Sequence, residues 1–577
     1  MGEVRSRTDK GKSRPEERIL LVLMPFWTSL IPPMGIACLK SFLQDHGFRV
    51  MAVNANEDLE LRQVYDRYFD RLHDYVPENR RGNFYNIGNN VLQHHLTAGL
   101  PYGEKTCYID LVRDLVFKTF YVNIADRQVL ELNRIVADFF RRLERYFLEL
   151  LAEEKPTILG VSVYSHTLAA SMFAFQLTRQ NYPGIKTVMG GGVFSELLAP
   201  GSSNLEFFLE KTGDYIDKII IGEGENLFLN WLQCKLPESQ RVYRLADIGG
   251  KILDISAAGV PDFSDFDLRH YPNLAAYGSR SCPFQCRFCS ETLQWGGRYR
   301  KKAAVQIVEE LAELQRRHGC RLFLMSDSLL NPLTQELAAE LEKRELSIYW
   351  DGYLRADRPV GELDNTFLWR RGGFYRARLG LESGSGRVLD LMGKKITVEQ
   401  IKAAVSSLAC AGIKTTTYWV IGYPGEREED FQRTLELIET LKDDIYEADC
   451  NPFNYYLTGQ VNSVDWERAY GSVPLYPKEA REMLVIQTRQ LNCEPSREET
   501  YRRLNRFVQH CRQLGIPNPY SLQEIVEADR RWTKLHKHAV PPLMDLRNSD
   551  SCVREEGLPG KWVPAENLYR DDGEWGF

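Results

Sequence analysis

From Ile19 onward, short apolar runs alternate with longer stretches of helical spacing. The apolar runs are strand-sized and rich in Val, Ile and Leu, which is typical of strands in a parallel sheet with helices on both faces. Helical stretches follow the first run, ending at Gly47, and the third, ending at about Asn181. The pattern predicts a doubly wound α/β domain over residues 18–254. Its expected strands are 19–25, 49–54, 158–164, 186–189 and 215–221.

A long insertion, residues 59–155, interrupts this alternation. It is rich in tyrosine, phenylalanine and paired arginines, and its helical spacing is strongest between Val129 and Leu151. Aromatic stripes of this kind usually form a core against a neighbouring domain, so we expect a packing role. The alternative is that the insertion shapes a substrate entrance.

A second alternating region follows a predicted linker at residues 255–277. A helix is expected from Lys301 to His318, with Gly319 near its end. Strand-like runs and helices then alternate, and repeated βα units curl into a barrel. We expect a partial barrel over residues 255–460, with strands at 321–325, 347–351, 375–381, 415–421 and about 446–448.

The two ends of the chain differ from this pattern. Residues 461–577 are predicted to form a helical domain that caps the barrel, and its last part, residues 540–577, is loop-rich. Residues 1–17 are polar and basic, lack the apolar segment of a signal peptide, and are predicted to be a disordered tail. The expected helices of the C-terminal domain are 479–491, 497–514 and 521–538.

Composition describes an ordinary globular protein of two or three domains. The chain has 577 residues, of which 43% are hydrophobic and 26% charged. Its formal net charge of −6 disfavours nucleic acid as a partner. No apolar stretch approaches the roughly 18 residues that a membrane helix needs, so no integral membrane segment is expected and a cytoplasmic location is predicted.

Three of the twelve cysteines stand close together, at Cys282, Cys286 and Cys289. A cubane iron–sulfur cluster usually takes four cysteines, so a loop offering three leaves one iron open to a ligand. The alternative is a structural zinc site, but such sites usually pair two short Cys/His clusters, and no second cluster is present. A disulfide loop is disfavoured because the other cysteines are single and far apart.

The Cys-x₃-Cys-x₂-Cys spacing and the residues around it resemble the radical SAM superfamily. The resemblance implies a 4Fe-4S cluster on the three cysteines, with S-adenosylmethionine (SAM) chelated to the free iron. It implies a 5′-deoxyadenosyl radical, formed with an electron from a reductant such as flavodoxin or ferredoxin. It also implies a (β/α)6 open barrel and places Phe288 beside the adenine.

Several residues at predicted strand ends match SAM-contacting positions of this family. Many relatives carry Gly-Gly-Glu after the second barrel strand. That motif is missing here, and Asp327 is expected to accept from the SAM ammonium instead. Arg355 is expected to meet the SAM carboxylate as a charge-assisted pair. Glu382 and Ser383 are assigned to the ribose, and Gly422, in a glycine-rich turn, to the adenine. Each could instead be a solvated loop residue or an ordinary turn.

Glycine-rich turns fall at the predicted carboxyl ends of two strands of the first domain. Ligands of parallel sheets bind at this edge, where glycine lets the backbone approach a bulky group. The order of the turns resembles the cobalamin-binding domain that precedes the barrel in cobalamin-dependent radical SAM enzymes. The resemblance assigns to this cofactor Ser162, Gly190, Gly191, Gly192, Gly222 and Glu223.

The Asp-x-His-x-x-Gly element, by which some cobalamin proteins supply a histidine to cobalt, is absent. His166 follows the third strand and could approach a bound ring, although a lone histidine at a helix start more often caps or packs. Two alternatives follow. Either the corrinoid sits without a protein histidine, or the domain has kept its fold and lost the cofactor.

The resemblance predicts a radical SAM enzyme that methylates an unactivated carbon with the help of cobalamin. One alternative is a cobalamin-independent cyclisation, oxidation or rearrangement on the same scaffold, and another is a metal-stabilised binding module. The expected substrate is a small molecule, a peptide or a lipid. Cys450 or the pair Tyr455–Tyr456 could deliver a hydrogen atom, but a buried cysteine is commonly inert, and no catalytic residue is assigned.

Overall fold

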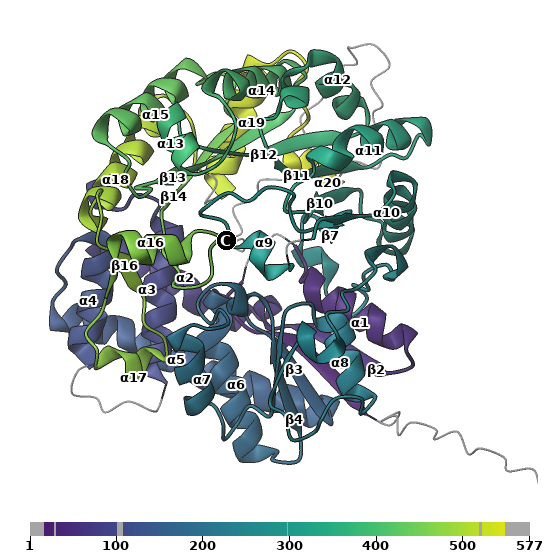
Figure 1. Cartoon of the computed structure of the whole chain (residues 1–577), viewed down its shortest axis with the longest axis vertical. Coiled ribbons are helices and arrows are strands. Elements are labelled where there is room, and N and C mark those ends of the chain that lie inside the picture. The colour runs from purple at the N-terminus through teal and green to yellow at the C-terminus, as the bar shows by residue number, and fades with distance from the viewer. Residues whose placement is uncertain (1–16, 28–30, 101–107, 297, 519–521, 549–577) are drawn as a thin grey trace, which may run out of the picture.

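The computed structural model describes residues 17–27, 31–100, 108–296, 298–518 and 522–548. Two parallel six-stranded sheets, each surrounded by helices, make up most of the molecule. In Figure 1 the first sheet lies in the lower half and the second, which includes β10 to β13, in the upper half. None of the described helices combines the length and the apolarity that crossing a membrane requires. The tail predicted for residues 1–17 lies almost wholly outside the described residues.

The first sheet has the strand order β2-β1-β3-β4-β5-β6, and all its pairs are parallel. From β1 the chain turns to one side for β2 and to the other side for β3, so the strand order reverses between β1 and β3. Ligands of such sheets bind beyond the carboxyl ends of the strands at this switch point. The doubly wound prediction is confirmed. The elements are β1 Arg18–Leu23, β2 Arg49–Asn54, β3 Ile158–Ser162, β4 Lys186–Gly190, β5 Lys218–Ile221 and β6 Val242–Arg244, with α1 Met34–Asp45, α6 Leu168–Asn181, α7 Ser203–Lys211 and α8 Gly224–Leu232.

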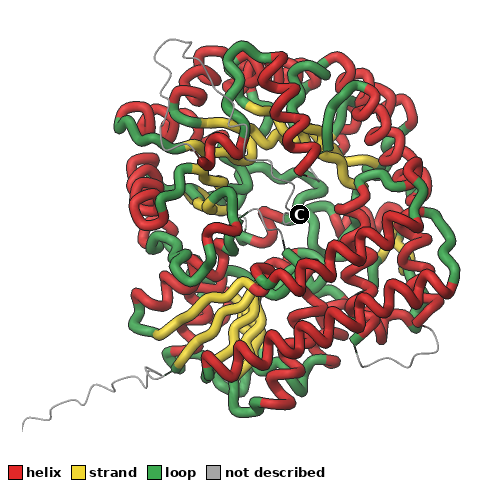
Figure 2. The backbone as a smooth tube through the Cα atoms, turned by 180° about the vertical axis from the view of Figure 1, so that it is seen from behind, coloured by secondary structure: helices red, strands yellow, loops and turns green. Residues whose placement is uncertain are grey.

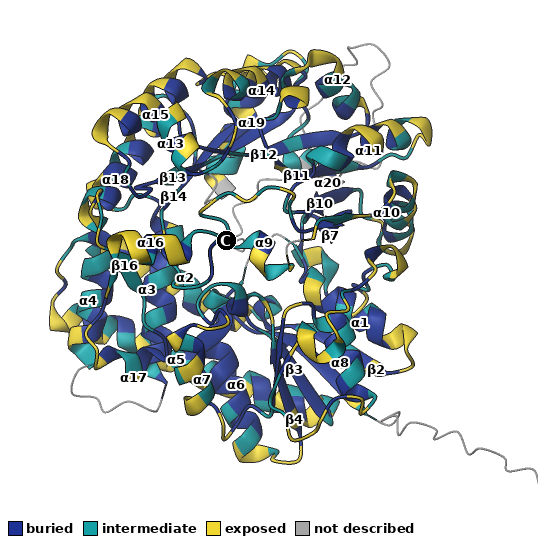
Figure 3. Cartoon of the chain, in the orientation of Figure 1, coloured by how far each residue is buried: buried dark blue, intermediate teal, exposed yellow. Residues whose placement is uncertain are grey.

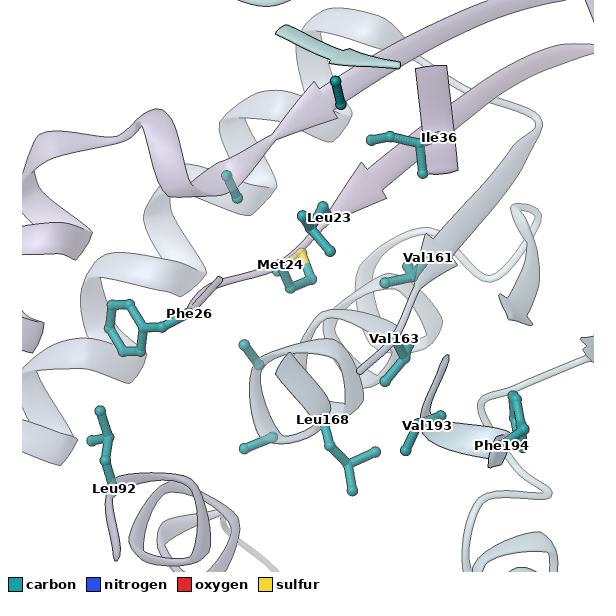
Figure 4. Close-up of a cluster of buried hydrophobic side chains, with 14 of the residues drawn as sticks. Leu23, Met24, Phe26, Ile36, Leu92, Val161, Val163, Leu168, Val193 and Phe194 are labelled. Atoms are coloured by element: carbon teal, nitrogen blue, oxygen red, sulfur yellow. The ribbon is translucent and has the colours of Figure 1, made fainter. Parts of the chain in front are cut away.

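A continuous apolar core lies behind this edge of the sheet. Figure 4 shows Leu23 and Met24 at the end of β1 together with Val161 of β3, Leu168 of α6 and Leu92 of α3, and all five are buried. Figure 3 colours the described residues by burial. The strands are buried, and the outer faces of the helices are exposed. This packing holds the carboxyl ends of the strands in place, so that a ligand site at this edge would be formed by well-positioned residues.

The insertion folds into helices that pack on the first sheet domain and reach the barrel. The long helix α5 buries one stripe at helical spacing, from Val129 to Leu151, against α2, α3, α4 and α6. Seen from behind, these long helices run beside the strands (Figure 2). The Asn83 side chain donates to the Cys450 carbonyl of the barrel at 2.7 Å. The predicted packing role is confirmed by these contacts. The helices are α2 Leu59–Tyr75, α3 Phe84–Gly99, α4 Tyr108–Phe120 and α5 Asp126–Glu154.

The second sheet is parallel throughout and follows chain order, from β7 through β10, β11, β12 and β13 to β14. Its end strands β7 and β14 do not pair with each other, so the predicted open barrel is confirmed. The linker prediction is wrong in one place, because β7, Leu274–Ala276, lies inside residues 255–277. A run of three residues is too short to show a pattern, and its pairing with β10 defines the strand. The other elements are β10 Leu322–Met325, β11 Tyr349–Leu354, β12 Phe374–Glu382, β13 Lys414–Ile421 and β14 Glu447–Pro452, with α10 Ala304–His318, α11 Asn331–Lys343, α12 Leu363–Arg371, α13 Gly386–Leu391, α14 Val398–Cys410 and α15 Glu428–Thr440.

The C-terminal region differs from the prediction at its start. Instead of one helix over 479–491, α17 covers only Ala480–Leu484, and β16, Arg489–Leu491, pairs antiparallel with β15, Ser472–Pro474. The helix stops because Val485 adopts a left-handed φ of +61°. The other two expected helices are confirmed, and α18 packs on β13, β14 and α15. Their bounds, with the two remaining helices, are α16 Ser463–Tyr470, α18 Arg497–Gln513, α19 Leu522–Leu535 and α20 Leu543–Asn548.

Candidate functional site

Cys282, Cys286 and Cys289 lie on an irregular loop between β8, Ser279–Arg280, and α9, Glu291–Gln294. Strand β8 pairs with β9, Arg300–Lys301. The three thiols are free and half-buried. The loop is held from two sides. The N–H of Arg287 donates to the Met392 carbonyl at 2.9 Å, and the N–H of Val461 donates to the Cys289 carbonyl at 3.2 Å. The barrel and the chain leaving it thus hold the three cysteines on one fixed turn.

Positive groups face the cysteine loop. The Nη1 atom of Arg355 lies 3.9 Å from the Sγ atom of Cys286. Burial raises the pKa of the Cys282 thiol, and the nearby Lys394 and Arg355 oppose that rise. Burial also raises the pKa of Cys289 to about 12. Burial thus favours the protonated thiols of Cys282 and Cys289 in the free protein, and a metal centre would have to displace these protons on binding.

The loop fits an iron–sulfur cluster better than a single metal ion. Among the described residues, no group of three His, Cys, Asp or Glu side chains is close enough to hold one ion. Zinc needs all its sulfurs about 2.3 Å from one atom. A cubane cluster instead binds each thiolate at a different iron, so it accepts a wider spacing of the sulfurs.

Asp327 and Arg355 lie beyond the carboxyl ends of β10 and β11, beside the cysteine loop. The buried Asp327 carboxylate accepts hydrogen bonds from the Gly278 N–H at 3.0 Å and the Ser279 hydroxyl at 2.5 Å, and burial raises its pKa to about 6. The Nε atom of Arg355 donates to Asp357 at 2.8 Å. Its Nη2 atom is buried without a partner among the described residues, so this atom is available to a ligand.

The other assigned residues of the barrel lie at the ends of β12 and β13 or on the cysteine loop. Glu382 adopts a left-handed φ of +66° and is ion-paired with Lys394 at 2.6 Å. Strained positions of this kind gather at functional sites. The hydroxyl of Ser383 accepts the N–H two residues further on at 3.1 Å. Gly422 has φ +77°, and helix α18 leaves no room there for a Cβ atom. Phe288 packs against an apolar cluster that includes Val388 of α13 and Tyr423.

A cavity of about 670 Å³, which we call the sheet-edge cavity, lies beyond the carboxyl edge of the first sheet. Glycine is required there. Gly191 and Gly222 have φ of +110° and +103°, and a Cβ atom on Gly191 would lie 2.5 Å from the Val163 backbone. The sheet-edge cavity is lined from one side by Ser162 and the turns 190–192 and 222–225, and from the other by Ser279, Arg280, α9 and Ser326. The structure thus brings both predicted glycine turns to the segment that leads into the cysteine loop.

The carboxylate of Glu223 is committed to protein partners. It is ion-paired with Arg280 and Arg300, and it accepts the Leu253 N–H at 3.0 Å. Arg280 is also paired with Glu225 at 2.6 Å. The side chain predicted to contact the cofactor therefore ties the first sheet to the two strands, β8 and β9, that flank the cysteine loop.

A second cavity of about 610 Å³, which we call the polar cavity, adjoins the first. Its lining comes from helix α3, from the turn at residues 164–168, from the loop after β14 and from the region of β16. The rings of Trp27 and Tyr164 stack with their centroids 4.2 Å apart. The residues that line both cavities are Trp27, Tyr164, Gly192, Ser195, Glu291 and Gln294. This common wall includes the helix that directly follows the cysteine loop.

Sequence reasoning missed most of the polar cavity. His166, considered as a neighbour of the corrinoid, lines the polar cavity instead, and burial lowers its pKa to about 4. Tyr455 and Tyr456 also line it, whereas Cys450 is fully buried in β14 and lines neither cavity. Gln93 could have been noticed as a polar residue among the apolar positions that α3 buries, such as Val91, Leu92 and Leu96. The remaining residues that line the polar cavity stand in no local sequence pattern that would have predicted their position there.

The stability of the protein is predicted to depend on pH through the Glu196 carboxyl group. Burial, with a smaller effect of Glu291, raises its pKa from 4.5 to about 7. The folded state therefore binds this proton more tightly than the unfolded chain, and the free energy of unfolding falls as the pH rises through this interval. The variant Glu196→Gln does not titrate. Its melting temperature is expected to rise relative to wild type by about 3 °C between pH 5 and pH 8.

Differential scanning fluorimetry at both pH values measures this change, and the exposed Glu439→Gln serves as the control. A difference between Glu196→Gln and wild type that does not depend on pH contradicts the prediction.

Comparison with known proteins agrees with this geometry. Residues 277–438 match the family model of the Radical SAM superfamily. Anaerobic magnesium-protoporphyrin IX monomethyl ester cyclase from Rubrivivax gelatinosus is 26% identical over 318 residues, which cover 50% of this chain and 55% of that protein. An uncharacterized methyltransferase from Pyrococcus horikoshii is 23% identical over 314 residues, covering 51% and 66%. The chain thus spans between half and two thirds of the length of these curated relatives.

Solved structures match over nearly the whole chain. The radical SAM methyltransferase TsrM from Kitasatospora setae, with tryptophan substrate and a SAM analogue bound, aligns with a TM-score of 0.56 and 14% identity over 92% of this chain and 95% of its own. The same enzyme with cobalamin and a 4Fe-4S cluster gives a TM-score of 0.55. At this identity the likeness establishes the fold, with a sheet domain before the barrel. Residues 277–438 therefore match the radical SAM superfamily, and the chain as a whole has the fold of these solved structures.

Proposed function

We propose that this protein is a cobalamin-dependent radical SAM methyltransferase acting on an unactivated carbon of a small molecule, a peptide or a lipid. The observation that carries the proposal is the wall shared by the two cavities at Trp27, Tyr164 and Glu291. A methyl donor in the sheet-edge cavity and a substrate carbon in the polar cavity would face each other across it, beside the helix that follows the cysteine loop.

The chain's own residues hold, orient and shield the reacting groups. When bound, the 4Fe-4S cluster, SAM and cobalamin supply the radical and the methyl group. Cys282, Cys286 and Cys289 would hold the cluster. The unpartnered Nη2 atom of Arg355 would orient the SAM carboxylate, as in other charge-assisted pairs. The apolar cores of the two sheets support these residues from behind.

The turns 190–192 and 222–225 would hold the corrinoid through their backbone groups. No histidine is among the described residues that line the sheet-edge cavity. This favours a corrinoid without a protein histidine ligand, the first of the two alternatives raised by the sequence. The size of the cavity favours a retained cofactor over a lost one.

The test is anaerobic reconstitution with iron, sulfide and hydroxocobalamin. We expect about four irons per chain, 5′-deoxyadenosine from SAM when reduced flavodoxin or ferredoxin is supplied, and corrinoid absorbance that survives gel filtration. Bound zinc in place of iron, with no 5′-deoxyadenosine formed, would refute the proposed enzymatic function. The metal-stabilised binding module would then be the remaining alternative.

A second candidate is a radical cyclisation without cobalamin, and the similarity to the cyclase from Rubrivivax gelatinosus supports the cyclisation. The same experiment separates it from methylation. 5′-Deoxyadenosine formation by protein that retains no corrinoid would favour the cyclisation.

A further inference from the structure

Gln93 is a buried amide that lacks a partner in the wall of the polar cavity. It lies on α3 and is 6% exposed, and neither its Oε1 nor its Nε2 atom has a hydrogen-bond partner among the described residues. Swapping the positions of the Oε1 and Nε2 atoms of Gln93 would still leave both without a hydrogen-bond partner. Buried amides are nearly always hydrogen-bonded, since an unpaired one destabilises the native state. The orphaned amide therefore indicates a ligand that both donates and accepts.

Polar neighbours of Gln93 are satisfied within the protein. The ring of His94 is hydrogen-bonded to the Asn90 carbonyl at 2.6 Å, and the hydroxyl of Thr97 donates to the backbone carbonyl of Gln93 at 2.8 Å. The unpaired amide thus differs from the neighbouring side chains of His94 and Thr97, which are both hydrogen-bonded. A group that complements both of its atoms is another amide.

Glu196 lines the polar cavity and has no ion-pair partner among the described residues. Arg489 is committed to Ser472 at 2.7 Å, and Arg497 to the Lys118 carbonyl at 3.1 Å. Burial lowers the pKa of both lining histidines, His94 and His166, which are therefore neutral. Glu196 faces a second carboxylate, Glu291, instead of a positive side chain. An ammonium group would find an anionic acceptor in Glu196, whereas the two lining arginines keep their charge and are held by hydrogen bonds to neutral oxygens.

We propose that the substrate is an amine that also carries an amide group, as in an amino-acid amide or the N-terminal end of a peptide. Its amide pairs with Gln93 and its ammonium with Glu196. The inference rests on the proposed function, because that function places the substrate in the polar cavity. Within the broad substrate range proposed above, it selects amide-bearing amines over anionic and purely apolar compounds.

Equilibrium dialysis of the anaerobically reconstituted protein at pH 8 tests the inference with three probes: phenylalaninamide, N-acetylphenylalaninamide and phenethylamine. The first has both groups, the second lacks the cation and the third lacks the amide. We expect Gln93→Leu to bind phenylalaninamide about tenfold more weakly and phenethylamine as wild type does, because two hydrogen bonds are lost. We expect Glu196→Gln to weaken both amines about tenfold and to leave the acetylated probe unchanged. The exposed Gln523→Leu and Glu439→Gln serve as matched controls.

A structural role for Gln93 predicts a different result. If its amide serves a ligand, Gln93→Leu removes an unpaired buried group, and the melting temperature of the free protein should stay the same or rise. A lower melting temperature together with unchanged binding of phenylalaninamide overturns the inference. So does binding of all three probes with equal affinity by wild type.

The same wild-type preparation is assayed for 5′-deoxyadenosine. Selective binding of phenylalaninamide without SAM cleavage refutes the proposed function alone. SAM cleavage without discrimination among the probes refutes this inference alone.

Discussion

Cys286→Ala is expected to leave the protein without an intact iron–sulfur cluster and to reduce SAM cleavage below about 1% of wild type. Each cysteine of the loop would bind a different iron, so the loss of one leaves a cubane with only two thiolates. The Arg355 Nη1 atom, 3.9 Å from the Cys286 sulfur, would lose its partner as well. Iron content, visible absorbance and 5′-deoxyadenosine formation, all measured without oxygen, report the effect.

The matched control is Cys410→Ala, because Cys410 is a free and exposed cysteine at the end of α14. This variant is expected to keep the iron and the activity of wild type. If Cys286→Ala retains about four irons and normal SAM cleavage, the assignment of the loop is wrong.

Gly191→Ala should abolish retention of a corrinoid and destabilise the first sheet domain by about 3 kcal/mol. Gly191 has φ +110°, and an added Cβ atom would meet both the N and the O atom of Val163 at 2.5 Å. These are backbone atoms, so the turn at the end of β4 must move away from β3. The movement displaces the wall of the sheet-edge cavity. Corrinoid absorbance after gel filtration and the melting temperature measure the two effects.

Gly201→Ala separates the steric clash from simple backbone strain. Gly201 also has a positive φ, +80°, but no atom lies within 4 Å of an added Cβ. We expect Gly201→Ala to lower the free energy of unfolding by only about 1 kcal/mol and to leave corrinoid retention unchanged. Equal losses of stability and corrinoid in the two variants would remove the argument for close backbone approach at Gly191.

Long buried strands and amphipathic helices could be predicted from local pattern. The strand Arg49–Asn54 has the predicted bounds, and α18 ends within one residue of its prediction. These elements carry their signal in six or more consecutive residues. The three-residue strands β7 and β16 carry no such signal, because pairing with a distant segment defines each of them. The sequence therefore predicted the layers and missed their shortest members.

Some candidate site residues could also be predicted from a local sequence pattern, whereas others depend on distant parts of the chain. The turns 190–192 and 222–225 could be predicted because each is rich in glycine, and in each one glycine, Gly191 or Gly222, has a positive φ that favours this residue type. The commitment of Glu223 to two arginines depends on residues 57 and 77 positions further along the chain, so no local pattern could show it. Gln93 and Glu196 stand next to no motif.

The amino-acid sequence by itself determined that three thiols lie close together and that the protein has two sheet layers. Three thiols within the eight residues from Cys282 to Cys289 stay together whatever the rest of the chain does, and apolar runs select buried strands. Only the tertiary structure decided that a glycine-lined cavity and a polar cavity share a wall beside that loop. Their lining comes from segments hundreds of residues apart, and whether a polar side chain such as Gln93 is paired depends on what packs against it.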